Sequence, residues 1–149
     1  MKKLTLLILV FILAAYSAGA PSEFDRNLQK WVDAGISHYR FSPFIGCFCP
    51  FGQDMPLTIE VQNNQAVSMT YSDGTRVPDD DPQYAFFDKY ATIDRIFSEL
   101  ESGLEGEADE VTAVYDTTYG YPTQVNFDFI KNAIDDELGL TVSNFEVLQ

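Results

Sequence analysis

The chain has 149 residues, and its 23 acidic residues outnumber nine basic ones, which gives a formal net charge of −14 at pH 7. A surface this negative repels nucleic acid and anionic lipid, so both are poor partner candidates. Aromatic residues make up 14% of the chain, too many for a disordered acidic tail, and a folded acidic domain is therefore expected.

The N-terminus shows the three parts of a secretory signal peptide. Two lysines precede an apolar run, residues 4–15, and small residues follow it. The run is shorter than the roughly 20 apolar residues that a membrane-spanning helix needs. We therefore expect residues 1–20 to be removed as a signal peptide, with cleavage after Gly19 as an alternative, which leaves residues 21–149 as a single α+β domain.

Residues 13–17 resemble the cleavage site of a bacterial lipoprotein, except that Tyr16 stands in place of the cysteine that such a site acylates. Without that thiol a lipid anchor is not expected. The sequence thus predicts a secreted or periplasmic protein with no stable membrane anchor after signal cleavage, and an uncleaved N-terminal anchor is the alternative.

The first half of the predicted domain reads as one helix followed by three strands. Ser22 and Asp25 have the spacing of a helix start, and apolar residues at helical spacing extend the helix over residues 23–35. Alternating apolar and polar residues predict the strands, with a tight turn at Asn63-Asn64 between the second and the third. These strands cover residues 38–41, running on through the cysteines, then 57–61 and 66–71.

The second half repeats that order after an acidic loop at residues 77–82. Thr92 can cap a second helix. The apolar stripe of this helix is Ile93, Ile96, Phe97, Leu100 and Leu104. Strands follow at residues 111–115, 123–127 and 140–147, with a turn at residues 116–122. Residues 129–138 fit either a short helix or a long hairpin connection.

Together these elements predict an α+β fold with an antiparallel sheet of about six strands and two helices on one face. The two halves share a pattern of elements rather than residues, which is compatible with two helix–β-meander units in tandem. Trp31 is expected in the core together with Ile93, Ile96, Phe97 and Leu100 of the second helix.

Six features of the chain, taken in order, resemble one exported family. They are the helix around Trp31, Tyr39-x-Phe41, Cys47-x-Cys49, Thr92-Ile93-Asp94-x-x-Phe97, Tyr115-Asp116 followed by Gly120-Tyr121-Pro122, and Asp135-Asp136-Glu137. The set is similar to the domain of unknown function 6174, found largely in bacterial secreted proteins and lipoproteins, over about residues 28–147. The resemblance implies an exported domain and supplies no catalytic residue.

Cys47 and Cys49 are the only cysteines in the chain. Two residues apart on a strand, they lie about 6.5 Å apart, near the upper limit for a disulfide, and Gly46 and Pro50 favour a bend that brings them closer. In an oxidising compartment a structural disulfide is expected. An exchangeable, thiol-redox pair is the alternative, although the chain has no Cys-x-x-Cys motif at a helix start.

Metal sites have weak support in the sequence. His38 is the only histidine, and with the two cysteines it would make a minimal Cu(I) or Zn site, but a surface or hydrogen-bonded role is favoured. Two acidic triplets could bind calcium through their oxygens, although neither has the Asp-x-Asp-x-Asp-Gly spacing. The triplets are Asp79-Asp80-Asp81 and Asp135-Asp136-Glu137.

Catalytic motifs are missing from the sequence. It contains no Gly-x-Ser-x-Gly, no His-Glu-x-x-His and no phosphate-binding glycine-rich loop. We therefore expect an exported, non-enzymatic binding module that needs no cofactor and acts on an unidentified protein or small-molecule partner. The alternatives are a thiol-redox or metal-handling protein that uses Cys47 and Cys49, and a calcium-binding acidic domain.

Overall fold

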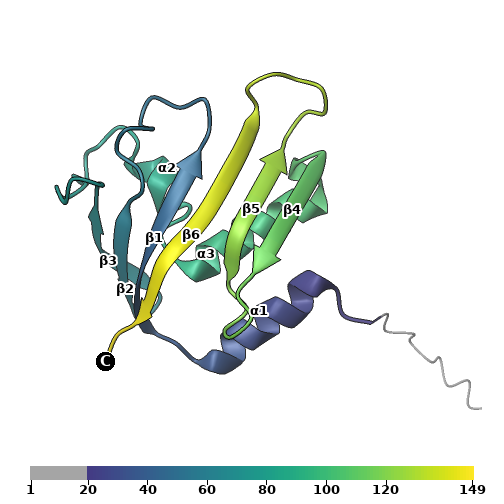
Figure 1. Ribbon diagram of the computed structural model, residues 1–149, viewed down its shortest axis with the longest axis horizontal. Helices are drawn as coiled ribbons and strands as arrows, with labels where there is room; N and C mark the ends of the chain where they lie inside the picture. The colour runs from purple at the N-terminus through teal and green to yellow at the C-terminus, as the bar shows by residue number, and fades with distance from the viewer. Residues whose placement is uncertain (1–19) are drawn as a thin grey trace, which may run out of the picture.

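The computed structural model describes residues 20–149, and the signal-peptide prediction falls outside this part apart from Ala20 (Figure 1). The elements are α1 (Glu23–Ala34), β1 (His38–Gly46), β2 (Thr58–Gln62), β3 (Gln65–Thr70), α2 (Tyr84–Asp88), α3 (Ile93–Ser102), the π-helical turn η1 (Gly103–Glu107), β4 (Glu110–Tyr115), β5 (Pro122–Asp128) and β6 (Glu137–Val147). Within the described residues, no helix has the length and apolar character needed to cross a membrane.

The strands form one open antiparallel sheet in the order β3-β2-β1-β6-β5-β4 (Figure 1). Each half of the chain contributes one three-stranded meander, and the meanders join where β1 pairs with β6. Phe24 of α1 meets Phe97 of α3 edge to face, with ring centroids 5.8 Å apart, so both helices cover the same face. The predicted α+β architecture is thereby confirmed.

Helix α1 begins and ends where its sequence predicts. The Ser22 hydroxyl accepts a hydrogen bond from the Asp25 amide at 3.0 Å, and the Asp25 carboxylate accepts one from the Ser22 amide at 2.8 Å. This capping box supplies partners for two amides that the helix leaves free. Gly35, with φ of 60°, closes the helix in the left-handed conformation that glycine adopts without strain.

An aromatic cluster joins α1 to the centre of the sheet. Trp31 is buried, and its ring lies edge to face against Tyr39, Tyr121 and Phe145 at centroid distances of 5.5, 6.3 and 6.0 Å. Its indole N–H donates to the Asp94 carboxylate at 2.9 Å. The expected core position of Trp31 is confirmed, and the hydrogen bond ties α1 to α3.

Helix α3 follows its prediction except at its end. Thr92 caps it by accepting a hydrogen bond from the Arg95 amide at 3.1 Å. The buried stripe is Ile93, Ile96, Phe97 and Leu100. Leu104, the last apolar residue of the predicted helical series and not one of the expected core positions, is 53% exposed. The helix widens into η1 at Gly103, and a π turn holds more residues than an α turn, which rotates Leu104 out of the stripe.

Strand β1 pairs with β6 along nearly its whole length but loses its pairing with β2 near a proline. It pairs with β2 only as far as Phe41, and Pro43, which has no N–H, accepts a hydrogen bond from the Leu57 amide at 3.0 Å. The strand ends at Gly46. The cysteines therefore lie in the bend after β1 and not on the strand, where the sequence placed them.

Two further segments differ from or complete the sequence prediction. The five-residue helix α2 was not expected, because it is too short for a helical period; it buries Phe87 against Phe51 at a centroid distance of 5.0 Å. Residues 129–136 form a hairpin connection rather than a helix. Strand β6 begins at Glu137, three residues before the expected start.

Candidate functional site

One face of the sheet carries no helix. Side chains alternate across each strand, so the residues between the core positions point to this open face. They include Arg40, Phe44, Glu60, Gln124, Asn126, Thr141 and Ser143. The fold thus leaves a broad, mostly polar surface accessible on the side away from the helices.

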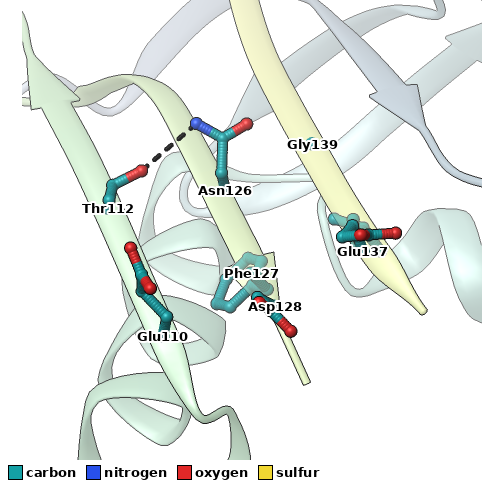
Figure 2. A pocket seen from close by; sticks show the side chains of 8 residues that line it. Glu110, Thr112, Asn126, Phe127, Asp128, Glu137 and Gly139 are labelled. Atoms are coloured by element: carbon teal, nitrogen blue, oxygen red, sulfur yellow. Dashed lines mark hydrogen bonds between the residues drawn. The ribbon is translucent and has the colours of Figure 1, made fainter. Parts of the chain in front are cut away.

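Three carboxylates form a row across the open face, which we call the acidic row. Glu110 on β4 pairs with Asp128 on β5, and Asp128 pairs with Glu137 on β6. Neighbouring strands lie about 4.8 Å apart, so the backbone brings three like charges close together. Figure 2 shows these side chains around a shallow recess of about 270 Å³.

The floor of the recess combines polar groups with a position that has no side chain. The Asn126 side-chain amide donates to the Thr112 hydroxyl at 3.2 Å, which fixes both side chains beside the row (Figure 2). Gly139 pairs with Asn126 and has no side chain to fill the space above β6. The recess therefore offers oxygen acceptors around an open floor, an arrangement suited to a cationic group.

The carboxylates of the acidic row repel one another, and no ion pair in the described residues neutralises them. Burial, and then the negative charges of Asp136, Glu137, Glu110 and Asp109, raise the pKa of Asp128 above its ordinary value. Within residues 20–149 none of these carboxylates forms an ion pair. The ion pairs present there are His38–Glu60, Arg40–Glu146, Arg76–Asp79, Lys89–Glu99 and Arg95–Asp88.

The connection between β5 and β6, which joins Asp128 to Glu137 along the chain, carries exposed apolar groups. Between Asp128 and Glu137, the side chains of Ile130 and Ile134 are 62% and 87% exposed. The Asp136 carboxylate accepts from the Ile130 amide at 2.5 Å, while its second oxygen is buried without a hydrogen-bond partner in the described part of the chain. Exposed apolar side chains beside polar ones are typical of interaction surfaces.

The two cysteines lie at the same end of the sheet. They form a disulfide with Cα atoms 5.1 Å apart, and the Cys49 amide donates to the Cys47 carbonyl at 2.8 Å within the bend. Phe48, between them, is 85% exposed. Neither residue is a free thiol in this structure.

A site made of His38 and the two cysteines is not assembled. His38 opens β1 and Cys47 follows its last residue, so about 30 Å of extended chain separates them. His38 Nε2 lies instead 3.0 Å from Glu60 Oε1 on the neighbouring strand. Among residues 20–149, no group of three or more His, Cys, Asp or Glu side chains is arranged to hold a metal ion.

The first acidic triplet considered for calcium already has protein partners. Asp79 forms an ion pair with Arg76 at 3.0 Å, and both side chains are exposed. Asp81 accepts from the Tyr71 hydroxyl at 2.5 Å, whereas Asp80 is exposed.

The second triplet is divided between a loop and a strand. Asp135 is exposed with φ of 68°, and Asp136 binds its own loop. Only Glu137 reaches the acidic row. Calcium binding by either triplet stays a prediction.

Sequence reasoning did not single out Glu110 and Asp128, because among so many acids no pair stands out. Their pairing does leave a signal in the β4–β5 hairpin. Counting outward from Tyr115 and Pro122 places Glu110 opposite Phe127, one residue short of Asp128. A register shift after Val114 corrects the count, and alternation requires it, because an apolar Phe127 belongs on the core face.

Comparison with known proteins identifies one family to which the chain is related. No curated protein and no solved structure matches the chain. Residues 23–147, which contain both meanders and the acidic row, match a family of unknown function, DUF6174. This match confirms the resemblance drawn from the sequence motifs. Because it covers most of the chain, the protein belongs to the family of unknown function DUF6174.

Proposed function

We propose that the protein is an exported, non-enzymatic binding module that holds a positively charged segment of another protein on the open face of its sheet. The observation that carries this proposal is the acidic row, which has no cation within ion-pair distance in residues 20–149. The chain connection between two of its members, Asp128 and Glu137, carries two exposed isoleucines. Complementary charge beside apolar contact area is what protein interfaces use for specificity.

Charge and size favour a basic side chain as the group bound in the recess. A lysine or arginine placed there would relieve the repulsion that contributes to the raised pKa of Asp128. The recess, of about 270 Å³, is smaller than the roughly 300–1,000 Å³ pockets that enclose small-molecule ligands. Nucleic acid and anionic lipid have the same sign of charge as the row and are disfavoured.

Export and the absence of enzymatic activity rest on the sequence. The N-terminal motif is that of a signal peptide, and the chain lacks the motifs of hydrolases, zinc proteases and nucleotide-binding enzymes. A disulfide between Cys47 and Cys49 accords with an oxidising compartment.

The test measures binding of a fluorescein-labelled peptide of alternating lysine and valine by fluorescence anisotropy at low salt. The triple variant E110Q/D128N/E137Q removes the charges of the acidic row. We expect it to weaken binding at least about tenfold, because charge-assisted contacts are lost. The matched control D33N/D54N/D80N removes three charges at exposed positions elsewhere and should change the affinity by less than about twofold.

Two outcomes would overturn the proposal. Equal weakening by both triple variants, with circular dichroism showing both folded, would mean that binding follows net charge alone. A second arm replaces the peptide by vesicles of phosphatidylcholine with and without phosphatidylglycerol. We expect no binding to either, and vesicle binding that the acidic-row variant abolishes would assign the surface to membranes.

A further inference from the structure

The two edges of the sheet differ in how they are covered. At the β3 edge the following segment folds back, because the Val77 amide donates to the Met69 carbonyl at 2.9 Å and Thr70 bridges to Arg76. At the other edge β4 pairs with β5 alone. An uncovered edge strand presents N–H and C=O groups to which a further strand can bind.

The sequence of β4 does not protect this edge. Edge strands commonly avoid pairing through prolines, lysines or an inward-pointing charge. The six residues of β4, EVTAVY, contain neither proline nor lysine, and the one charged residue, Glu110, is on the open face. The strand is thus exposed and able to pair.

A groove follows β4 on its helix side. The N-terminal part of α1 forms the far wall through Glu23 and Phe24, and the exposed Leu104 of η1 stands at one end. Two recesses, of about 250 Å³ and about 420 Å³, share Glu23, Ala113 and Tyr115, so they form one continuous groove. The exposure of the apolar Leu104 side chain is explained if this side chain contacts a bound segment.

Side chains of β4 alternate between this groove and the acidic recess. Ala113 and Tyr115 line the groove, whereas Glu110 and Thr112 line the recess on the open face. A strand added beside β4 has the same alternation. One set of its side chains would enter the groove, and the other set would lie next to Glu110 and the acidic row. The groove is mostly apolar near Phe24, Leu100 and Leu104, whereas Asn27, Lys30 and Asp116 line its other part.

A second copy of this chain is a poor occupant. Each copy has a net charge of −14, so the approach of two copies is opposed by their like charge. Like charges placed together at an interface oppose association. Charge complementarity therefore favours a different, basic partner.

We propose that β4 binds an extended segment of another protein, with apolar and basic residues in alternation, as a further strand of the sheet. Main-chain hydrogen bonds along β4 would provide affinity, and the groove would select the apolar side chains. The inference rests on the proposed function in that the acidic row supplies the attraction for the basic residues.

The first experiment tests backbone pairing with the alternating lysine–valine peptide. In a strand the amides of alternate residues point to the same side. We therefore compare peptides N-methylated at every valine or at every lysine. One of these isomers should bind within about twofold of the parent and the other at least about tenfold more weakly. Equal binding by both isomers and the parent would overturn strand addition.

The second experiment locates the bound strand. Hydrogen exchange of residues 110–115 should slow when the peptide is bound, while residues 65–70 should be unaffected. Slowing that occurs at high protein concentration without peptide would identify a second copy as the occupant. Slowing at β3 alone would overturn the assignment to β4.

The third experiment probes the groove with a matched pair of variants. Leu104→Ser removes an exposed apolar contact in the groove and should weaken peptide binding by about fivefold or more. Val32→Ser changes an equally exposed residue, 59% against 53%, outside the groove, and should have no effect. Equal effects of the two variants would contradict a role for the groove.

The outcomes also separate this inference from the proposed function. If E110Q/D128N/E137Q abolishes binding but N-methylation and Leu104→Ser do not alter it, the acidic row binds the partner and strand addition is wrong. If a threonine–valine peptide binds with the N-methylation pattern above and the acidic-row variant has no effect, strand addition stands and the proposed function falls. Absence of binding by every peptide overturns both.

Discussion

At the scale of single residues, the carboxylates of this protein differ by what surrounds them. Asp73 accepts a hydrogen bond from the Thr75 amide at 2.8 Å, and hydrogen bonds to Thr75 lower its pKa. Asp128 lies among other acids, and burial together with their charges raises its pKa. The first carboxylate is stabilised in its ionised form by the fold, and the second is destabilised.

Asp128→Asn is expected to stabilise the protein at neutral pH. A carboxyl group whose folded pKa is raised binds its proton more tightly in the folded state, so wild-type stability falls as pH rises from the unfolded pKa, about 3.9, through the folded one. Asparagine does not ionise, so the D128N variant does not lose this stability as pH rises. Thermal unfolding followed by circular dichroism should give D128N a higher Tm than wild type at pH 7 and an equal Tm at about pH 3.

Asp73→Asn serves as the control with the opposite sign. The fold lowers the pKa of Asp73, so its ionised carboxylate stabilises the folded protein at pH values above the unfolded-state pKa. This contribution is lost as pH falls through the folded-state pKa. D73N should therefore have a lower Tm at pH 7 and approach wild type at low pH. A lower Tm of D128N at pH 7 would contradict the repulsion inferred at the acidic row.

At the scale of elements, the end of α3 lies very close to β5. A Cβ atom on Gly103 would be 2.7 Å from Phe127 Cε1 and 3.1 Å from Val111 Cγ2. Phe127 is buried on β5, so its ring has little room to move. The absence of a side chain at this one position sets how closely helix and sheet approach.

Gly103→Ala is therefore expected to destabilise the protein. Overpacking of this kind costs about 1–3 kcal/mol, which exceeds the gain of about 1 kcal/mol that alanine brings as a helix former. Urea unfolding can be followed by the fluorescence of Trp31, the single tryptophan. Gly52→Ala is the control, because nothing lies within 4 Å of a Cβ there, and an equal effect of both changes would refute the close contact.

Local signals explain which elements the sequence predicted. α1 and α3 have capping residues at their starts and long apolar stripes, and the turn at Asn63-Asn64 has the positive φ angles, 51° and 60°, that asparagine tolerates. The short helix α2 has no such signal. The place of Glu137 in the acidic row was also out of reach, because it depends on the register of β5 against β6 across a connection of eight residues, 129–136.

At the scale of the whole molecule, negative charge dominates the surface. The net charge is −14, and most basic side chains of the described part are already in ion pairs with acids far from the acidic row. The remaining acids repel one another in the compact state more than in the expanded, unfolded chain. Folding is therefore opposed by a long-range electrostatic term.

Salt should consequently stabilise the protein. Raising sodium chloride from about 20 mM to about 300 mM shortens the screening length severalfold, so we expect the Tm to rise by several degrees. The triple variant E110Q/D128N/E137Q, with three fewer charges, should show a smaller rise. A Tm that falls with salt would mean that the exposed ion pairs outweigh the repulsion.

The pairing of β1 with β6 at the centre of the sheet also determines when the sheet can be completed during synthesis. About ninety residues separate Gly46 from its partner Gly139, and β6 is the last of the six strands of the sheet to leave the ribosome. Until it arrives, the chain has a three-stranded ribbon and a two-stranded ribbon with nothing between them, and the inner edge of β1 is bare. The final strand to emerge is the one that makes the two ribbons a single sheet.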